Sequence, residues 1–293
     1  MAKLLLGKEV IAPILASLKE RAAALKAQGV LPTLALVRVG EKPEDLSYQR
    51  SLEALCEKLG IRVCLSVFPE DSQKETLLDS LHSLDKDPEI HGILLFQPLS
   101  KKLAPFMGEL CNAISPEKDP DGMTDLSLSG VFQGKELGFA PATAEACLAV
   151  LDHYGYDLSG KNVCVIGRSP VVGRPLSMLL LQRNATVTIC HSKTQNLLEI
   201  CKRADILISA AGSLRLVTKD FVSPGQTLLD VSTNWDPNKI TKHGRGGISG
   251  DADFAAVEPL LQAISPVPGG LGPVTVPVLL SHLLTAAEKT CSI

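Results

Sequence analysis

Apolar residues in the first half of the chain repeat first with the period of a helix and then in short continuous runs. Over residues 7–28, positions such as Ile14 and Leu18 recur at helical spacing until Gly29, which predicts an amphipathic helix. The apolar run over 33–39 predicts a strand. The alternation continues along the chain and predicts helices over 48–59, 72–84 and 104–114 and strands over 61–67 and 92–96.

Turn-forming residues separate this half of the chain from a second set of strands. Loop signals cluster over 115–138, which places a domain boundary near residue 140. Strands that alternate with helices pair in parallel, so we predict a two-domain α/β fold. Beyond the boundary, apolar runs predict strands over 161–166, 186–190, 206–209 and 227–231, followed by a final helix over 274–289.

The composition is that of an ordinary globular chain. Its 293 residues are 45% hydrophobic and 21% charged, enough for about two domains with a sizeable core. A net charge of −3 with scattered basic residues gives no electrostatic basis for binding nucleic acid or an anionic membrane. The eight cysteines form no C-x-x-C pair, and Lys8 and Glu9 interrupt the apolar start of the chain. We therefore expect a cytoplasmic protein with reduced cysteines, no metal and no membrane segment.

The stretch from Val163 to Pro175 carries the clearest chemical signal. An apolar strand ends at Gly167, and the turn that follows opens a helix. Backbone N–H groups at a helix start point toward an anion, and glycines let the backbone approach a pyrophosphate closely. The pattern is G-x-S-x-x-x-G, at Gly167, Ser169 and Gly173, in place of G-x-G-x-x-G. It predicts a Rossmann-like dinucleotide-binding domain, and a nucleotide-free α/β domain with the same turn remains the alternative.

The residues after the next strand bear on which dinucleotide would bind. An NAD-specific enzyme usually places Asp or Glu there, against the ribose 2′-hydroxyl. Here the strand ends in His191-Ser192-Lys193-Thr194, and no acid is present. Arg168, Ser192 and Lys193 offer donors and positive charge for a 2′-phosphate, so the pattern favours NADP over NAD. We interpret His191 as a structural or phosphate-flanking residue.

Further motifs extend over nearly the whole chain. They are Tyr48, the run 116–122 (PEKDPDG), the glycine turn with Val172-Gly173-Arg174-Pro175, and the run 266–275 (PVPGGLGPVT). In this order they resemble the FolD family of methylenetetrahydrofolate dehydrogenase/cyclohydrolases. The resemblance implies NADP as cofactor, a tetrahydrofolate substrate and a homodimer. It also implies a catalytic folate-binding domain of residues 1–140 plus 273–293, to which the C-terminal helix returns, and an NADP-binding Rossmann-like domain of residues 141–272.

The resemblance implies two reactions. Methylenetetrahydrofolate is oxidised to methenyltetrahydrofolate by hydride transfer to NADP, and the methenyl bridge is then hydrolysed to give 10-formyltetrahydrofolate. Catalysis and substrate contact fall to Tyr48 and Asp121, where Asp121 would hold the pterin by accepting two parallel hydrogen bonds; a simple turn-forming role for Asp121 is the alternative. Pro268, Gly269 and Gly270 are similar to a wall of bare backbone for substrate and nicotinamide, or to a hinge. The implied cofactor contacts are Gly167, Arg168, Ser169, Gly173, Ser192 and Thr233.

Two substitutions depart from the family pattern at its catalytic face. The family places a lysine one helical turn after the tyrosine and a glutamine two residues before a strand-ending proline. This chain has Leu52 and Phe96 at those positions, and strand alternation directs Gln97 to the opposite side, so the amide is expected to be lost as well. Loss of the lysine alone would leave the glutamine amide unpaired in a closed cleft, at a cost of about 1–3 kcal/mol, and replacing both residues by an apolar pair avoids this cost. We expect hydride transfer to be retained and hydrolysis to be weak, absent or rebuilt by other groups.

Two other functions remain open from the sequence. A cleft with Leu52 and Phe96 would also suit a different cyclic amine or a modified folate, with NADP binding unchanged. A catalytically silent relative would bind nucleotide or folate as a regulator, or pair with an active paralogue. Ligand binding without turnover would distinguish this silent relative from both enzymes.

Overall fold

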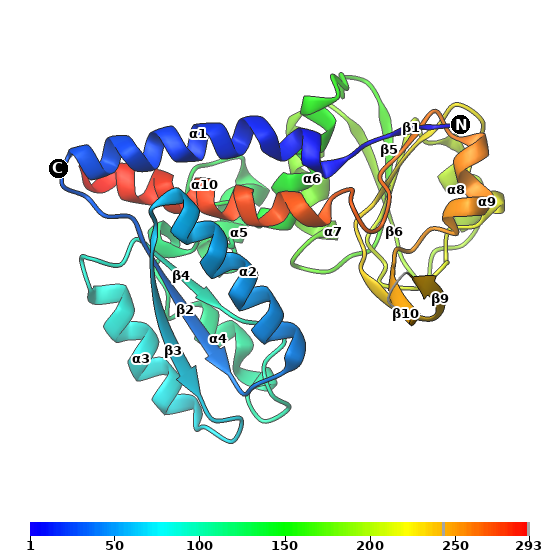
Figure 1. Ribbon diagram of the computed structural model, residues 1–293. Coiled ribbons are helices and arrows are strands. Elements are labelled where there is room, and N and C mark those ends of the chain that lie inside the picture. The colour runs from blue at the N-terminus through cyan, green and yellow to red at the C-terminus, as the bar shows by residue number, and fades with distance from the viewer. Residues whose placement is uncertain (242–243, 292–293) are drawn as a thin grey trace. The chain divides into compact units, whose positions relative to one another are not determined.

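The computed structural model describes residues 1–241 and 244–291 (Figure 1). The chain packs as two compact units, which we name by their sheets: the six-stranded unit, residues 1–12 with 143–275, and the three-stranded unit, residues 13–142 with 276–293. The division at 142 lies close to the boundary expected near 140. Residues 1–12 differ from the expected grouping, because β1 (Lys3–Leu4) pairs in parallel with β11 (Ala263–Ile264) of the larger sheet.

The three-stranded unit is built from a parallel sheet with helices on both sides. Its elements are β2 (Thr33–Val39), α2 (Pro43–Leu59), β3 (Arg62–Phe68), α3 (Lys74–Lys86), β4 (Gly92–Leu95), η1 (Ala104–Phe106), α4 (Met107–Cys111), η2 (Pro116–Lys118) and α5 (Asp125–Gln133), with most of α1 (Gly7–Ala27) and α10 (Gly272–Thr290). The strand order is β3-β2-β4, and β2 is buried along its whole length.

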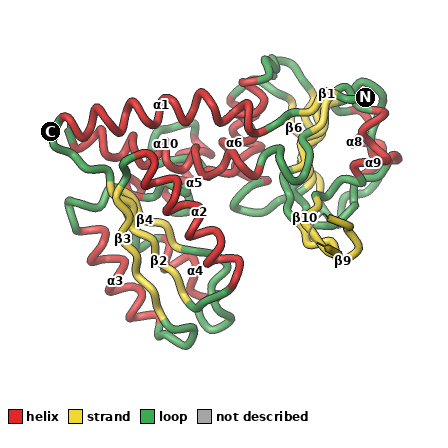
Figure 2. The backbone as a smooth tube through the Cα atoms, in the orientation of Figure 1, coloured by secondary structure: helices red, strands yellow, loops and turns green. Residues whose placement is uncertain are grey.

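Side-chain alternation divides the core of this unit between the two faces of its sheet. Alternate residues of β2 and β4 pack with Leu77 and Leu81 of α3 and Leu110 of α4. Figures 1 and 2 show α2 and α3 on opposite sides of the strands. Arg21 of α1 joins α10 by donating from Nε to Glu288 at 2.7 Å.

The six-stranded unit is a parallel sheet with an added hairpin. Its elements are β1, α6 (Ala142–His153), β5 (Asn162–Ile166), α7 (Gly173–Gln182), β6 (Thr186–Cys190), α8 (Leu197–Arg203), β7 (Ile206–Ser209), η3 (Lys219–Phe221), β8 (Thr227–Asp230), β9 (Asn234–Thr241), β10 (Gly244–Ser249), α9 (Phe254–Val257), η4 (Glu258–Leu260) and β11. The strand order is β1-β11-β8-β7-β5-β6, and β9 pairs with β10 in an antiparallel ribbon.

The order of these strands fixes where a ligand can bind. From β5 the chain first adds β6 on one side and then crosses to add β7 on the other. The strand order therefore reverses between β5 and β7, and in open parallel sheets ligands bind outside the carboxyl ends of the strands at such a point.

The predicted two-domain α/β fold is confirmed, and individual elements differ from the prediction. Helix α2 begins earlier than predicted, because Pro43 fits the first turn of a helix. The stretch predicted as loop contains α5, which begins where Thr124 Oγ1 accepts the backbone N–H of Ser127 at 3.1 Å. The helix predicted over 104–114 is instead the short pair η1 and α4, and the hairpin β9–β10 was not predicted.

Candidate functional site

The glycine turn after β5 is a close junction of three backbone segments. Gly167 has a φ of +132°, and a Cβ there would lie 2.3 Å from the carbonyl oxygen of Ala210. A Cβ at Gly173 would lie 2.1 Å from the carbonyl oxygen of Gly167. Ser169 Oγ closes the turn by accepting the N–H of Val172 at 3.1 Å. Glycine is therefore required at both positions for these backbone segments to meet at the start of α7. A turn of bare backbone at a helix N-terminus fits a dinucleotide phosphate.

The other predicted cofactor contacts lie at the same edge of the sheet. All neighbouring strands of the six-stranded sheet are parallel, so their carboxyl ends share one edge. Gly167 follows β5, Ser192 follows β6, Thr233 follows β8, and the segment 268–270 follows β11. The fold therefore brings the predicted cofactor residues and the glycine-rich segment to one edge.

Hydrogen bonds join neighbouring loops at this edge. The N–H of Gly167 donates to the carbonyl of Cys190 at 2.9 Å, which ties the turn after β5 to the end of β6. The N–H of Gly212 donates to Ser232 Oγ at 3.0 Å, which ties the loop after β7 to the loop after β8. The edge is thus a connected set of loops.

The residues expected near a 2′-phosphate lie in an ordered turn. The backbone N–H of His191 donates to Thr194 Oγ1 at 2.8 Å, and His191 Nδ1 accepts the N–H of Lys193 at 3.1 Å. The His191 imidazole therefore helps to form the turn, in agreement with the structural role predicted for it. Arg168, Ser192 and Lys193 are exposed, and their side chains can reach a ligand above the edge.

The glycine-rich segment is fixed against the start of α1. The N–H of Gly7 donates to the carbonyl of Gly269 at 2.9 Å, and a Cβ on Gly7 would lie 2.0 Å from the oxygen of Gly270. Gly269 has a φ of +105°, a conformation that favours glycine. Pro268 and Gly269 are exposed, so the segment presents bare backbone, which suits a ligand wall and also a hinge.

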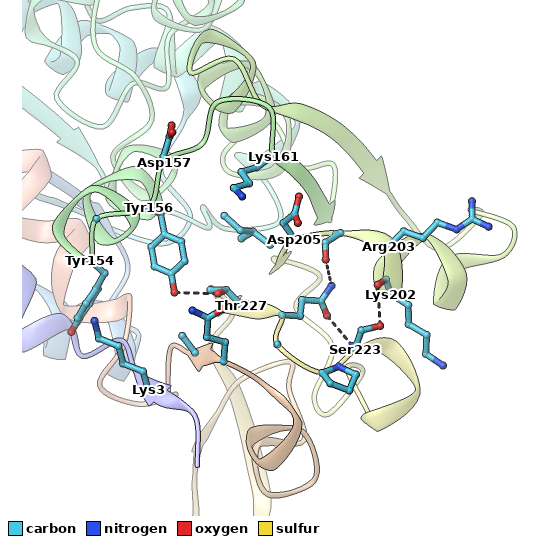
Figure 3. Close-up of a pocket in the computed structure, with 18 residues that line it drawn as sticks. Lys3, Tyr154, Tyr156, Asp157, Lys161, Lys202, Arg203, Asp205, Ser223 and Thr227 are labelled. Atoms are coloured by element: carbon cyan, nitrogen blue, oxygen red, sulfur yellow. Dashed lines mark hydrogen bonds between the residues drawn. The ribbon is translucent and has the colours of Figure 1, made fainter.

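A cavity of about 700 Å³ lies at the opposite, amino edge of this sheet. Lys3, Lys161, Asp205 and Thr227 line it, each at or next to the start of a strand. In Figure 3 the hydroxyl of Tyr156 points to Thr227, at 3.1 Å, while two further basic side chains extend outward. None of the predicted cofactor or substrate residues lines this cavity, so it is separate from the candidate site.

In the three-stranded unit, Asp121 lies in a loop that is held on both sides. The carboxylate of Asp119 accepts the N–H of Thr124 at 2.7 Å and the hydroxyl of Ser127 at 2.8 Å. His282 Nδ1 lies 2.8 Å from the carbonyl oxygen of Pro120. These contacts fix the backbone that presents Asp121.

The Asp121 carboxyl group changes protonation near neutral pH. Desolvation raises its pKa to about 7, the negative charge of Asp119 adds to the rise, and His282 opposes it. The residue as a whole keeps some exposed surface, so a ligand can reach the group. A carboxyl with this pKa is a candidate for binding or proton transfer.

Tyr48 lies close enough to Asp121 to sense its charge. Burial raises the pKa of the Tyr48 hydroxyl well above its ordinary value, and the negative charge of Asp121 raises it further. The Tyr48 ring meets the ring of Phe96 edge to face, with centroids 5.5 Å apart. Leu52, on the next turn of α2, is completely buried. The structure thus brings Tyr48 and Asp121 together beside an apolar face.

Gln97 is a site residue that sequence reasoning set aside. Alternate β4 residues line a small cavity, and Gln97 continues the series beside Asp119 and Asp121. Its Nε2 lies 3.9 Å from Cys111 Sγ. Gln97 and Asp121 therefore line the same small cavity, so the amide stays next to a candidate substrate residue. No local signal could show this, because Cys111 and Asp121 reach Gln97 only through the fold.

Comparison with known proteins adds an independent observation. The model of the tetrahydrofolate dehydrogenase/cyclohydrolase catalytic domain matches residues 5–121, and that of the NAD(P)-binding domain of the same proteins matches residues 141–291. This chain belongs to the tetrahydrofolate dehydrogenase/cyclohydrolase family. The family resemblance drawn from the motifs is confirmed.

Relatives in this family match over almost their whole length. The bifunctional protein FolD of Clostridium botulinum (strain Langeland) is 43% identical over 289 residues, 99% of each chain. The crystal structure of FolD from Campylobacter jejuni is 34% identical with a TM-score of 0.92, covering 99% of this chain and 100% of that one. FolD of Trypanosoma brucei, solved with NADP and an inhibitor, is 30% identical with a TM-score of 0.90, covering 99% and 98%.

The described residues contain neither a cluster of metal ligands nor a membrane-spanning helix. Within residues 1–241 and 244–291, no group of three or more His, Cys, Asp or Glu side chains could hold a metal ion. In the same part of the chain, no helix has the length and apolar character needed to span a membrane.

Proposed function

We propose that this chain is an NADP-dependent 5,10-methylenetetrahydrofolate dehydrogenase of one-carbon metabolism. The observation that carries the proposal is the cradle at Gly167 and Gly173, at the edge where the predicted cofactor residues meet. Family membership over nearly the whole chain supports the folate substrate. A relative solved with NADP supports the choice of cofactor.

The predicted cofactor residues would bind NADP and orient its nicotinamide ring toward the substrate. When bound, NADP would supply the hydride acceptor for oxidation of the methylene carbon. Gly167, Ser169 and Gly173 would hold its phosphates, and Arg168 and Ser192 its 2′-phosphate, with Thr233 beside them. The reaction then depends mainly on how closely two rings are oriented.

On the substrate side, Asp121 would hold the pterin, with Tyr48 beside it. The ionised carboxylate accepts two parallel hydrogen bonds from the ring. Pro268, Gly269 and Gly270 would supply a wall of backbone with no side chain to obstruct the substrate. These assignments give each residue a contact that mutation can test.

We expect this chain to catalyse the hydrolysis of methenyltetrahydrofolate less effectively than the hydride transfer. Hydrolysis needs an activated water, and Tyr48 is a poor base because burial and Asp121 raise its pKa. Leu52 is completely buried and Phe96 packs on Tyr48, so an apolar face stands where the family has a lysine and a glutamine. The same observation supports a second candidate, an NADP enzyme acting on an altered folate or another cyclic amine.

A paired absorbance assay tests the proposal. Purified protein is given methylenetetrahydrofolate and NADP, and NADPH and methenyltetrahydrofolate are followed together. Equal accumulation of both indicates a dehydrogenase without effective hydrolysis, whereas NADPH without methenyl accumulation indicates that another group performs the hydrolysis. Absence of both signals, with NADP still bound, would overturn the proposal in favour of the altered substrate or of a non-catalytic binding protein.

Assembly and location are part of the same proposal. The hairpin β9–β10 exposes Trp235 by 67% and Ile240 by 87%, and a second copy of this chain would cover such apolar side chains. We therefore expect a homodimer, which light scattering on the purified protein tests. The eight cysteines are free thiols, which fits the proposed cytoplasmic location because thiols there are kept reduced.

A further inference from the structure

A buried carboxylate lies beneath the loops of the cofactor edge. Asp251 has no exposed surface, and among residues 1–241 and 244–291 no Lys, Arg or His forms an ion pair with it. Its charge is met by hydrogen-bond donors alone. Oδ2 accepts from Ser209 Oγ, Ala211 N and Ser232 Oγ, each at 2.8 Å, and Oδ1 accepts from Ser213 N at 2.7 Å and Asn234 Nδ2 at 3.0 Å.

These donors come from the end of β7 and the loop that follows it, and from the segment between β8 and the start of β9. Ser232 and Asn234 are the two neighbours of Thr233, and each donates to a different oxygen of Asp251. The loop after β7 packs against the glycine turn, because the carbonyl of Ala210 occupies the space beside Gly167. One carboxylate therefore sets the position of Thr233 relative to the phosphate cradle.

The backbone of Asp251 is itself fixed. The carboxylate of Asp230, at the end of β8, accepts the N–H of Asp251 at 3.0 Å and that of Ala252 at 2.8 Å. A Cβ at Gly250 would lie 1.9 Å from Asp230 Oδ2, so glycine is required for this approach. The N–H of Val217 donates to the carbonyl of Asp251 at 2.9 Å. Hydrogen bonds to Asp230 and Val217 thus hold the backbone of Asp251 in place, and its carboxylate gives both loops a fixed acceptor.

We infer that Asp251 is a positioning residue for cofactor binding, which holds the loops after β7 and β8 in the arrangement that receives NADP. The inference rests on the proposed function, since it takes Thr233 and the glycine turn as the cofactor contacts. It assigns Asp251 no contact with the ligand. Its effect reaches NADP through the loops.

Asp251→Asn is the sharpest test, because every contact to this side chain is a donor. An asparagine has one acceptor oxygen and one NH₂ group, so in either orientation the NH₂ faces a backbone N–H, of Ala211 or of Ser213. We expect the Kd for NADP, measured by calorimetry, to rise about tenfold or more. The KM for NADP should rise with it, while kcat at saturating NADP changes much less.

Asp119→Asn provides a matched control for the binding measurement. Asp119 is 2% exposed and also accepts only backbone N–H and hydroxyl donors, but it lies in the three-stranded unit. Its replacement should lower thermal stability without changing the Kd for NADP. The single tryptophan, Trp235, directly follows Asn234, so its emission reports on the Thr233 segment and should change in Asp251→Asn and not in the control.

Milder variants keep the inference testable if Asp251→Asn does not fold. Ser232→Ala and Asn234→Ala each remove one donor, and each should raise the Kd for NADP by a few fold. An unchanged Kd in folded Asp251→Asn, or in both milder variants, would overturn the inference and leave Asp251 with a purely structural role. If the wild-type protein itself fails to bind NADP, the proposed function fails, and the inference fails with it.

Discussion

Replacing Asp121 with asparagine should stabilise the ligand-free protein at pH 8 while abolishing its folate binding. Burial raises the pKa of this carboxyl from 3.8 to about 7, so the folded protein resists an ionisation that the unfolded chain undergoes freely. As the pH rises from about 4 to about 7, the wild-type protein loses unfolding free energy, because the unfolded state releases the proton first. Asparagine carries no charge and escapes this cost.

The magnitude follows from the two pKa values. One pKa unit corresponds to about 1.4 kcal/mol, so the raised pKa of Asp121 lowers the free energy of unfolding by about 2 kcal/mol at pH 5 and about 4 kcal/mol at pH 8. Since Asp121 retains some exposed surface, solvent screening makes these figures upper limits. The stabilisation by Asp121→Asn should therefore be about 2 kcal/mol larger at pH 8 than at pH 5.

Urea unfolding of the wild type and of Asp121→Asn at both pH values measures this difference. Asp79→Asn is the control, because Asp79 is exposed on α3 of the same unit, and it should show no such dependence on pH. Folate affinity of the wild type should fall about tenfold per pH unit below 7, as the carboxyl loses its charge. A stabilisation by Asp121→Asn that is equal at the two pH values, or a destabilisation at pH 8, would refute the reasoning.

Three further substitutions probe the cofactor edge and the apolar face. Gly167→Ala should raise the Kd for NADP by about tenfold or more, because its Cβ would meet the carbonyl of Ala210; titration by calorimetry checks this, and an unchanged Kd would count against the cradle. Arg168→Ala should raise the KM for NADP and leave that for NAD unchanged, since only NADP carries the 2′-phosphate; equal effects in steady-state assays with both would contradict the assignment. Leu52→Lys alone should lower the free energy of unfolding by about 3–5 kcal/mol, because it buries an unpaired charge. The double variant Leu52→Lys with Phe96→Gln should recover stability and hydrolyse methenyltetrahydrofolate faster than the wild type. If hydrolysis does not increase, these two positions do not limit that reaction.

The main elements and the cofactor edge could be predicted from local pattern. A continuous apolar run marks the fully buried strands of the parallel sheets, such as β2 and β7, because these strands are covered on both faces. The role of Gly167 and Gly173 can also be predicted locally, because a phosphate-binding turn needs backbone without side chains. The position of the cofactor residues at one edge can also be predicted, because the carboxyl ends of parallel strands lie at the same edge of a sheet.

The sequence by itself determined the α/β class, the order of elements, the glycine turn and the family. Only the tertiary structure decided that Gln97 lies beside Asp121, that residues 1–12 join the larger sheet, and that Asp251 holds the loops around Thr233. The physical reason is range: periodicity and turn chemistry act between near neighbours in the chain. The environment of a buried polar group is set by donors from distant segments, and those donors meet only when the chain folds.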